Sequence, residues 1–416
     1  MKDNKNFWRY IGGRFISLNG SGIQTIALPL YVLDSTGSGT LMGILSMFIL
    51  IPILMTAPFA GVIGDRSDRR NIMIAMDFGR GILVCILAVI AMRGNFNIYI
   101  LFILQIFISM MDSIFNSSSI ALMPDLISKD ELMEANSIKS GFDAASNIIG
   151  PMLGGVIYGI WGIQAVFYIN SASFVISGIF SILITYRKKA VQTEKINVRI
   201  FLHKNNEILK FIVSKRGLFQ LFTFAMFANF FLAPLFDVVM PYVLKKEVGF
   251  TSEQYGYIAG FLAVGALLGN ISILMYFKKL GLKQLMRYGF TFETILRMAV
   301  CGLVFPSIVS IYGGATWTLF ILIGSFCMMM EFFNAFVNTS IGTNLQNLVP
   351  DKMRSRFFAI LGMFSQGAMP LGALLFGTLL DLVKYYDLLI AMNLLVIIAV
   401  IVFLLKACDE AYEAKN

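Results

Sequence analysis

The sequence predicts an all-α integral membrane protein whose twelve transmembrane helices form two pseudo-symmetric six-helix bundles. The 416 residues are 57% hydrophobic and only 14% charged, whereas soluble domains are about half apolar and a quarter charged. The mean hydropathy is +0.77. Twelve apolar runs of about 20 residues or more are each long enough to cross a membrane as a helix, and a basic segment divides them six and six.

Charges and turn residues mark the ends of each run. The predicted helices cover 8–32, 41–63, 72–92, 98–122, 136–160, 163–186, 217–243, 254–277, 284–305, 315–344, 355–381 and 386–406. Of the 33 lysines and arginines, only four lie in the loops of one side: Arg93, Lys245, Lys246 and Lys384. Because basic loops stay in the cytoplasm, both termini are predicted to be cytoplasmic, in a multi-pass protein of the cell membrane.

The basic segment predicts the domain organisation. It separates an N-terminal half, 1–186, from a C-terminal half, 217–416, and the linker 187–216 carries nine basic residues. Apolar residues recur in the linker near helical spacing, which predicts an amphipathic helix lying on the inner leaflet.

A charged turn joins the second and third runs. Its members are Gly61, Gly64, Asp65, Arg66, Arg69 and Arg70. Glycines permit close helix packing, and Asp65 is placed to accept hydrogen bonds from the N–H groups that open the next helix. The alternative is a loop whose charges only orient the protein in the membrane.

The fifth run contains a second motif, formed by Gly150, Pro151, Gly154 and Gly155. The proline removes a helix hydrogen bond, and the glycines permit both a bend and close backbone contact. A structural kink alone is the alternative. The halves also share a pattern, because the fourth run ends in Pro124-Asp125 and the tenth ends in Pro350-Asp351.

These motifs together resemble the major facilitator superfamily of transporters over essentially the whole chain. The charged turn resembles the superfamily's cytoplasmic signature between helices two and three, and Gly-Pro-x-x-Gly-Gly resembles the motif of its drug antiporters. The opening Arg14-Phe-Ile-Ser-Leu-Asn-Gly-Ser-Gly, Leu28-Pro-Leu-Tyr and Ala135-Asn136-Ser137 resemble the branch of macrolide-efflux proteins and the enterobactin exporter. Ser137 and Ser146 stand where the fullest antiporter motif has glycines.

The resemblance implies a monomeric major facilitator fold that exports an amphipathic organic compound in exchange for protons, by alternating access. It further implies that the charged turn holds the cytoplasmic side closed, with Asp65 and Arg69 contacting the neighbouring half.

Intramembrane carboxylates are the candidates for proton coupling, because ionisable groups are costly in hydrocarbon and should face the interior or a cavity. Asp112 and Glu331 lie near the middle of the fourth and tenth runs, which are repeat partners, and the other two candidates are Asp237 and Glu293. The alternative for Asp112 and Glu331 is a structural hydrogen bond to a polar neighbour such as Asn116 or Asn334.

The remaining intramembrane polar residues have local or substrate-binding explanations. Opposite charges three or four residues apart predict ion pairs on one helix face: Asp77 with Arg80, Lys139 with Asp143, and Glu293 with Arg297. Candidate cavity residues are Arg14, Gln24, Asn116, Asn229 and Asn334. Three alternatives are open for Arg14: it neutralises an acidic partner, it contacts an anionic group of the substrate, or its long side chain extends to the membrane–water interface.

Enzymatic and nucleic-acid functions find no support in the sequence. There is no phosphate-binding loop and no nucleophile turn, and one histidine with four dispersed cysteines does not predict a metal site. We therefore expect no cofactor, with an amphipathic small molecule, protons and the lipid bilayer as partners. The alternatives are a transporter of the same fold for a siderophore, lipid or metabolite, and a non-transporting membrane receptor or assembly partner.

Overall fold

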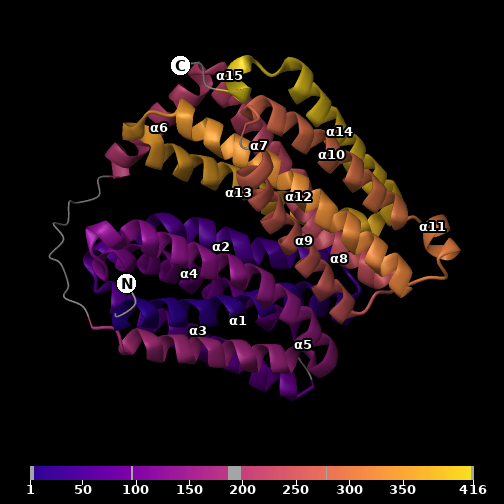
Figure 1. The fold of residues 1–416 in the computed structure, drawn as a ribbon. Coiled ribbons are helices and arrows are strands. Elements are labelled where there is room, and N and C mark those ends of the chain that lie inside the picture. The colour runs from indigo at the N-terminus through magenta and orange to yellow at the C-terminus, as the bar shows by residue number, and fades with distance from the viewer. Residues whose placement is uncertain (1–3, 95–96, 186–197, 278, 414–416) are drawn as a thin grey trace. The chain divides into compact units, whose positions relative to one another are not determined.

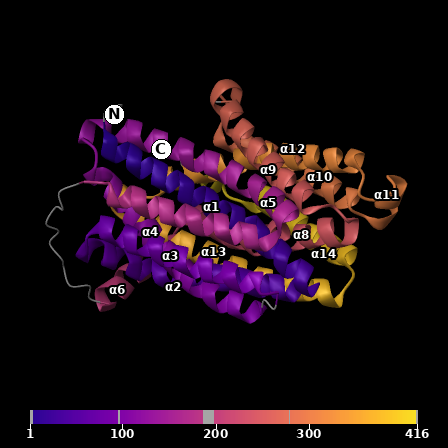
Figure 2. The same ribbon diagram turned by 90° about the horizontal axis from the view of Figure 1, so that it is seen from below.

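The computed structural model is helical throughout the part of the chain that it describes. It describes residues 4–94, 97–185, 198–277 and 279–413, without the side chains of 61–66, 129, 198–205, 351, 352 and 355. Every regular element in those ranges is a helix (Figures 1 and 2). Ten of these helices are long and apolar enough to cross a membrane.

The first of two compact units, unit 1, contains Met1–Thr36, Leu45–Glu194 and Thr251–Tyr257. Its helices are α1 (Lys5–Thr36), most of α2 (Gly39–Arg66), α3 (Arg69–Met92), α4 (Ile98–Leu122) and α5 (Leu132–Ile182), with short 3-10 turns η1 (Met123–Asp125) and η2 (Lys129–Glu131). Helix α5 packs along α1 and α3, and α3 also packs against α4. Polar residues on these helices therefore meet in the interior of the unit.

Helix α5 accounts for two predicted spans, because the chain turns sharply inside it. Gly162 has φ 71° and ψ −175°, a conformation that residues with a Cβ avoid. The arms 132–161 and 163–182 match the predicted runs 136–160 and 163–186. The non-helical backbone lies at Gly162, whereas Pro151 stays within regular helix.

The second unit, unit 2, contains Gly37–Ile44, Lys195–Phe250 and Ile258–Asn416. Its helices are α6 (Val198–Ser214), α7 (Arg216–Pro234), α8 (Met240–Tyr242), most of α9 (Ser252–Ser272), α10 (Leu282–Leu303), α11 (Pro306–Ile311), α12 (Trp317–Leu348), α13 (Asp351–Leu382), α14 (Tyr385–Lys406) and α15 (Asp409–Tyr412). The π-helical segments η3 (Leu235–Val239), η4 (Val243–Val248) and η5 (Ile273–Phe277) extend α7, α8 and α9. Helix α10 occupies the predicted run 284–305, but its charged residues keep it out of the ten apolar spans.

Helix α6 lies inside the predicted linker, 187–216. Residues 187–197 of the linker fall outside the described residues. Its Ile208 and Ile212 are buried in a hydrophobic cluster together with Leu218 and Phe357. This apolar face packs against helices α7 and α13 within unit 2. The expected position of this helix at the inner leaflet stays a prediction.

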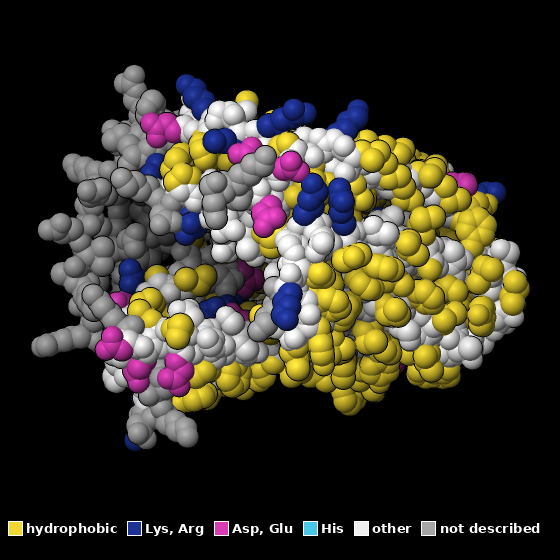
Figure 3. Space-filling model, turned by 45° about the horizontal axis from the view of Figure 1, so that its top comes forward, with side chains coloured by type: hydrophobic (Ala, Val, Ile, Leu, Met, Phe, Trp, Pro, Cys, Tyr) yellow, Lys and Arg dark blue, Asp and Glu magenta, His cyan; other side chains and the backbone are white. Residues whose placement is uncertain are grey.

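The outer surface carries the apolar side chains expected of membrane helices. On α14 an exposed stripe recurs every three or four residues, which is the spacing of one helix face: Ile390, Leu394, Ile398, Ile401 and Leu405. Figure 3 shows hydrophobic side chains over much of the visible face and most charged side chains toward one end of it. Lipid is the environment that suits such a surface.

Candidate functional site

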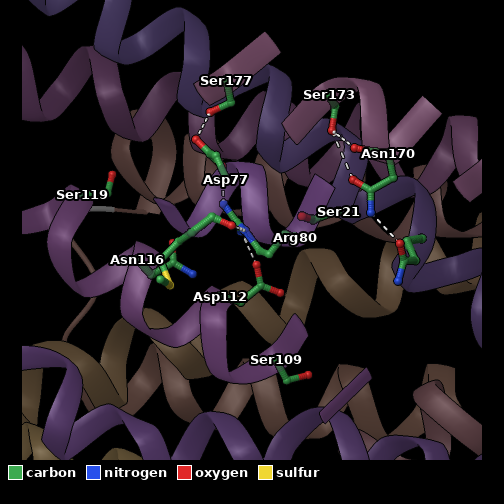
Figure 4. A network of polar contacts seen from close by, with 12 residues as sticks. Ser21, Asp77, Arg80, Ser109, Asp112, Asn116, Ser119, Asn170, Ser173 and Ser177 are labelled. Atoms are coloured by element: carbon green, nitrogen blue, oxygen red, sulfur yellow. Dashed lines mark hydrogen bonds and ion pairs between the residues drawn. The ribbon is translucent and has the colours of Figure 1, made fainter. Parts of the chain in front are cut away.

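A buried arginine in unit 1 is held by two carboxylates from different helices. Asp77 and Arg80 lie one turn apart on α3, and Asp112 lies on α4. The Arg80 guanidinium bonds both carboxylates (Figure 4). The side chain of Asp77 is 0% exposed, that of Arg80 2% and that of Asp112 27%. We call these three residues the Arg80 cluster, and Asp112 is the member that solvent reaches.

Neighbouring side chains stabilise the charges of the Arg80 cluster. Ser177, on the second arm of α5, donates a hydrogen bond to Asp77 over 2.8 Å from Oγ to Oδ2. Phe115 and Phe174 face the guanidinium of Arg80, whose central carbon lies 4.2 and 4.3 Å from their ring centroids. Aromatic faces attract such cations. The predicted Asp77–Arg80 ion pair is confirmed, but sequence spacing did not reveal its link to Asp112 or Ser177.

The charge balance of the Arg80 cluster suits it to proton binding. With both carboxylates ionised, two negative charges face one positive charge. A net charge is unfavourable in a buried site, and one bound proton brings the cluster to neutrality.

Arg14 on α1 also has an acidic partner. Its Nε and Nη2 lie 2.8 and 3.1 Å from the two carboxylate oxygens of Asp143, which is a bidentate geometry. Lys139 bonds the same carboxylate over 2.7 Å, as predicted from its spacing. The acidic-partner alternative for Arg14 is therefore confirmed. Asn116 contacts Arg14 over 3.3 Å, and it is not the partner of Asp112.

Uncharged side chains of α1, α4 and α5 form a second buried network. The Asn170 amide donates to Gln24 Oε1, and the Gln24 amide donates to Gln105 Oε1 over 3.2 Å. Gln105 in turn donates to Ser109 over 3.2 Å. Figure 4 labels Asn170 and Ser109, which lie at the two ends of this chain of hydrogen bonds. The amide of Gln24, a predicted cavity residue, is thus bonded at both of its ends within unit 1.

Unit 2 carries an arginine and two glutamates on the predicted counterpart helices, with a different pairing. Glu293 and Arg297 form the predicted ion pair on α10, with 3.2 Å between Oε1 and Nη1. The Nε of Arg297 bonds Asn393 Oδ1 on α14 over 3.2 Å. We call these three residues the Arg297 cluster. The remaining nitrogen, Arg297 Nη2, is buried and has no hydrogen-bond partner among the described residues.

Glu331 on α12 is not held by an arginine. Its side chain is only partly exposed, and it forms no hydrogen bond or ion pair with any other residue that the structure describes. Asn334, the suggested partner of Glu331, instead accepts a hydrogen bond from Asn338. Glu331 is therefore a carboxylate whose charge is not neutralised by a direct contact in the described part of unit 2.

A cavity of about 130 Å³ adjoins the Arg297 cluster inside unit 2. This volume equals that of about four water molecules, at roughly 30 Å³ each. Asn229 on α7 and Asn334 on α12, both predicted cavity residues, line it together with Glu293 and Arg297. Its aromatic walls are Phe224, Phe227 and Phe290. The cavity thus offers amide, charged and aromatic groups to a small ligand or to part of a larger one.

Asp237 lies apart from both arginine clusters. It belongs to the π-helical segment η3, which begins directly after Pro234. Its side chain is exposed, and it forms no ion pair or hydrogen bond with the residues that the structure describes. π-Helical turns often occur at functional sites, so the location keeps Asp237 among the candidates.

The charged turn lies largely within two helices, because α2 continues to Arg66 and α3 begins at Arg69. Four motif members are described by their backbone alone: Gly61, Gly64, Asp65 and Arg66. The carboxylate that caps α3 is Asp68, whose Oδ1 accepts from Asn71 N over 3.1 Å. Asp65 lies inside α2, which is longer than predicted, and its expected hydrogen bonds to the start of α3 stay a prediction because its side chain lies outside the described residues.

The last two arginines of the turn are bound within unit 1. Arg69 Nη1 bonds Asp125 Oδ2 over 2.7 Å, and Arg70 Nη1 bonds Ile184 O over 2.8 Å. They tie the start of α3 to the ends of α4 and α5. The contact of Arg69 with the other half stays a prediction.

The glycines of the fifth run make the close contacts that the sequence predicted. A Cβ on Gly150 would lie 3.0 Å from Gly22 Cα, and one on Gly154 would lie 2.5 Å from Ile23 O. A Cβ on Gly155 would lie 2.5 Å from Gly256 Cα. The motif therefore packs α5 tightly against α1 and against the first turns of α9.

Comparison with known proteins identifies the family. Macrolide efflux protein A of Streptococcus pyogenes is 23% identical over 386 residues, which are 89% of this chain and 88% of that protein. The Staphyloferrin A transporter of Staphylococcus aureus is 22% identical and covers 89% of each chain. The crystal structure of a mutant of the nucleoside transporter NupG superposes with a TM-score of 0.73 at 13% identity, covering 96% of this chain and 99% of that one. Residues 11–324 match the family model of the Major Facilitator Superfamily, and the chain therefore belongs to this superfamily of transporters.

Proposed function

We propose that this transporter is a secondary active exporter that exchanges protons for drugs or similar amphipathic organic compounds by alternating access. The Arg80 cluster is the observation that carries the proposal. Two carboxylates share one cation, so one bound proton brings the cluster to neutrality. Asp112 is exposed enough to exchange that proton with water. The efflux function named for the macrolide relative supports the direction of transport.

Proton binding at Asp112 would weaken the ion pair with Arg80 that joins α4 to α3. The ionised carboxylate attracts Arg80, whereas the protonated one leaves Arg80 to Asp77 alone. A proton thus favours one arrangement of these helices over another, which is the differential binding that coupling requires. Glu331, Glu293 and Asp237 are the other coupling candidates.

The cellular setting is part of the proposal. The protein lies in the cell membrane as a monomer, with both termini in the cytoplasm. Asp65 and Arg69 help to hold the cytoplasmic side closed in one state of the cycle. An Asp65→Asn protein that transports normally in both directions would contradict this gate.

The test is uptake of a lipophilic fluorescent cation into inverted membrane vesicles with an imposed pH gradient, acid inside. We expect the natural protein to accumulate the dye and Asp112→Asn to abolish accumulation, with Glu331→Gln as the second test. Asp387→Asn, which changes an exposed carboxylate outside both clusters, is the matched control and should transport normally. Proton-driven uptake that survives both Asp112→Asn and Glu331→Gln would overturn the assigned coupling site.

A transporter of the same fold for a siderophore, lipid or metabolite is the second candidate. The relative named Staphyloferrin A transporter favours it. Arg14 and Arg80 do not, because carboxylates already bind both guanidinium groups. Gradient-driven flux of a siderophore, with no flux of the lipophilic cation, would decide for this candidate.

A further inference from the structure

Each unit includes the start of a helix whose remainder belongs to the other unit. Gly37–Ile44, with the first turn of α2, belongs to unit 2, whereas Thr251–Tyr257, with the first turns of α9, belongs to unit 1. Helices α2 and α9 are the second helices of the two predicted halves, so these two segments are counterparts. They are held in different ways.

The start of α2 packs directly against the backbone of α13. A Cβ on Gly39 would lie 2.6 Å from Gly377 O and 2.9 Å from Leu380 Cβ. A Cβ on Gly43 would overlap the carbonyl oxygen of Ala373. Small residues on both helices thus bring the backbones into contact.

Asp381, near the end of α13, caps the start of α2. Its Oδ1 accepts a hydrogen bond from Gly39 N over 2.7 Å, and its Oδ2 accepts one from Thr40 N over 2.9 Å. The hydroxyl of Ser38 donates to Oδ2 over 2.6 Å. The first N–H groups of a helix lack partners within the helix, and the helix dipole favours an anion at this end. One carboxylate from another helix therefore fixes the beginning of α2.

A lysine reinforces the same attachment. The ammonium group of Lys246 donates to Gly37 O over 2.6 Å and to the hydroxyl of Tyr242 over 2.8 Å. Gly37, two residues before α2, is thus tied to α8 and η4 within unit 2.

The start of α9 has a cap that is formed by its own residues. Thr251 N donates to Gln254 Oε1 over 2.9 Å, and Gln254 N donates to Thr251 Oγ1 over 3.3 Å. This reciprocal capping box involves only residues at the start of α9, so it moves together with that helix. Gly256 packs against Gly155 of α5. A separation of α9 from α5 would keep its cap, whereas a separation of α2 from α13 would lose the bonds to Asp381.

We propose that Asp381 is a positioning residue that latches the first turn of α2 onto α13, and that this latch opens during each transport cycle. The inference rests on the proposed alternating access, whose orientation places this end of the helices outside. Asp381 is solvent-exposed, so water can replace its bonds when the latch opens. The charge is nonetheless aimed at the N–H groups of Gly39 and Thr40, which favours the closed arrangement.

The first test measures the latch without any substrate. Spin labels at Leu41→Cys, in the first turn of α2, and Leu382→Cys, at the end of α13, both within unit 2, are placed in purified full-length protein whose native cysteines are replaced by alanine. We expect a short and a long distance, with the long-to-short ratio rising about fivefold in Asp381→Asn, which removes the charge at nearly constant shape. Ser38→Ala should give a smaller rise, and Asp387→Asn none. One unchanged distance in all variants would overturn the latch, whether or not the protein exports drugs.

The second test asks whether opening is necessary. In Ser38→Cys/Asp381→Cys, a short bis-methanethiosulfonate reagent should link the two cysteines and stop dye uptake, and reductant should restore it. The matched control is Asn6→Cys/Thr185→Cys, a pair that is hydrogen-bonded within unit 1 and should transport when linked. Unchanged uptake by linked Ser38→Cys/Asp381→Cys protein would overturn the required opening. Failure of the proposed export function is distinct, because it would abolish uptake in the natural protein as well.

Discussion

The two units contain the same set of charges on counterpart helices but connect them differently. In unit 1, Arg80 bonds a carboxylate on its own helix and a second one on α4. In unit 2, Arg297 bonds Glu293 on its own helix, and its Nε donates a hydrogen bond to the amide oxygen of Asn393 on α14. Glu331 is left without such a bond in the described part of unit 2. In unit 1 both carboxylates therefore bond the arginine, whereas in unit 2 only Glu293 does and Glu331 does not.

The difference teaches that a count of acids and bases does not define a site. The Arg80 cluster has two carboxylates and one arginine, and so does the set Glu293, Arg297 and Glu331. Only in unit 1 does the arginine bond both carboxylates, so only there does its removal leave two carboxylates without the cation that they contact. The expected effects of substitution differ accordingly, and the following predictions run from the largest to the smallest.

Arg80→Met should be the most damaging change. It leaves Asp77 buried and Asp112 half-buried with no counter-charge, and breaking such a pair costs about 3–5 kcal/mol. Arg297→Met should cost less, because it strands one glutamate. The loss of helical signal during denaturation in detergent measures both. Addition of Asp77→Asn and Asp112→Asn to Arg80→Met should recover most of the stability, and no recovery would refute the charge explanation.

Ser177→Ala should have the next largest effect. The hydroxyl bonds a buried carboxylate, and a hydrogen bond to a charged group contributes about 1.5–3 kcal/mol. Ser173→Ala is the control on the preceding turn, where the hydroxyl bonds the backbone and amide of Asn170. Denaturation in the same detergent should show the smaller loss in Ser173→Ala, and equal losses would count against the Arg80 cluster as a special site.

Phe115→Leu tests the aromatic contact of Arg80. A cation over an aromatic ring gains about 0.5–2 kcal/mol, so the variant should lose about that amount beyond its change in packing. In an Arg80→Met background, where the cation is missing, this extra loss should vanish. A double-mutant cycle measures the difference, and additive effects would exclude a contribution from the cation.

Glu331→Gln should change stability least. Without a direct bond to lose, it should stay within about 0.5 kcal/mol of the natural protein. Asp112→Asn, its counterpart in unit 1, should destabilise more, because it weakens a bond to Arg80. The same denaturation experiment compares the two variants. A larger loss of stability in Glu331→Gln than in Asp112→Asn would contradict the contrast between the arginine-bound carboxylate of unit 1 and the unbound one of unit 2.

Sequence patterns predicted what lies along one helix better than what lies between helices. The apolar runs, the break between the fifth and sixth runs and the same-helix ion pairs follow from local spacing. The contacts of Arg80 with Asp112, Arg14 with Asp143 and Arg69 with Asp125 depend on how each helix is rotated against its neighbour. One sequence does not contain that information in any local pattern.

Small errors in helix ends changed the interpretation of nearby residues. Helix α2 was predicted to end at 63, which left Asp65 as the expected cap of α3. The helix continues to Arg66, and Asp68 caps α3. Asp381 was the last residue of a predicted run and received no role, because its partners lie more than 300 residues earlier in the chain.

Because α2 and α9 are each divided between the units, the chain cannot be split at the linker into two fragments that each contain a whole unit. A break in 187–216 separates two polypeptides, but neither contains a whole unit, because Gly37–Ile44 stays with the first piece and Thr251–Tyr257 with the second. The second piece alone leaves Asp381 without the helix start that it caps. Split fragments of this transporter should therefore complement each other only when both are made in the same membrane, where each supplies the segment that the other is missing.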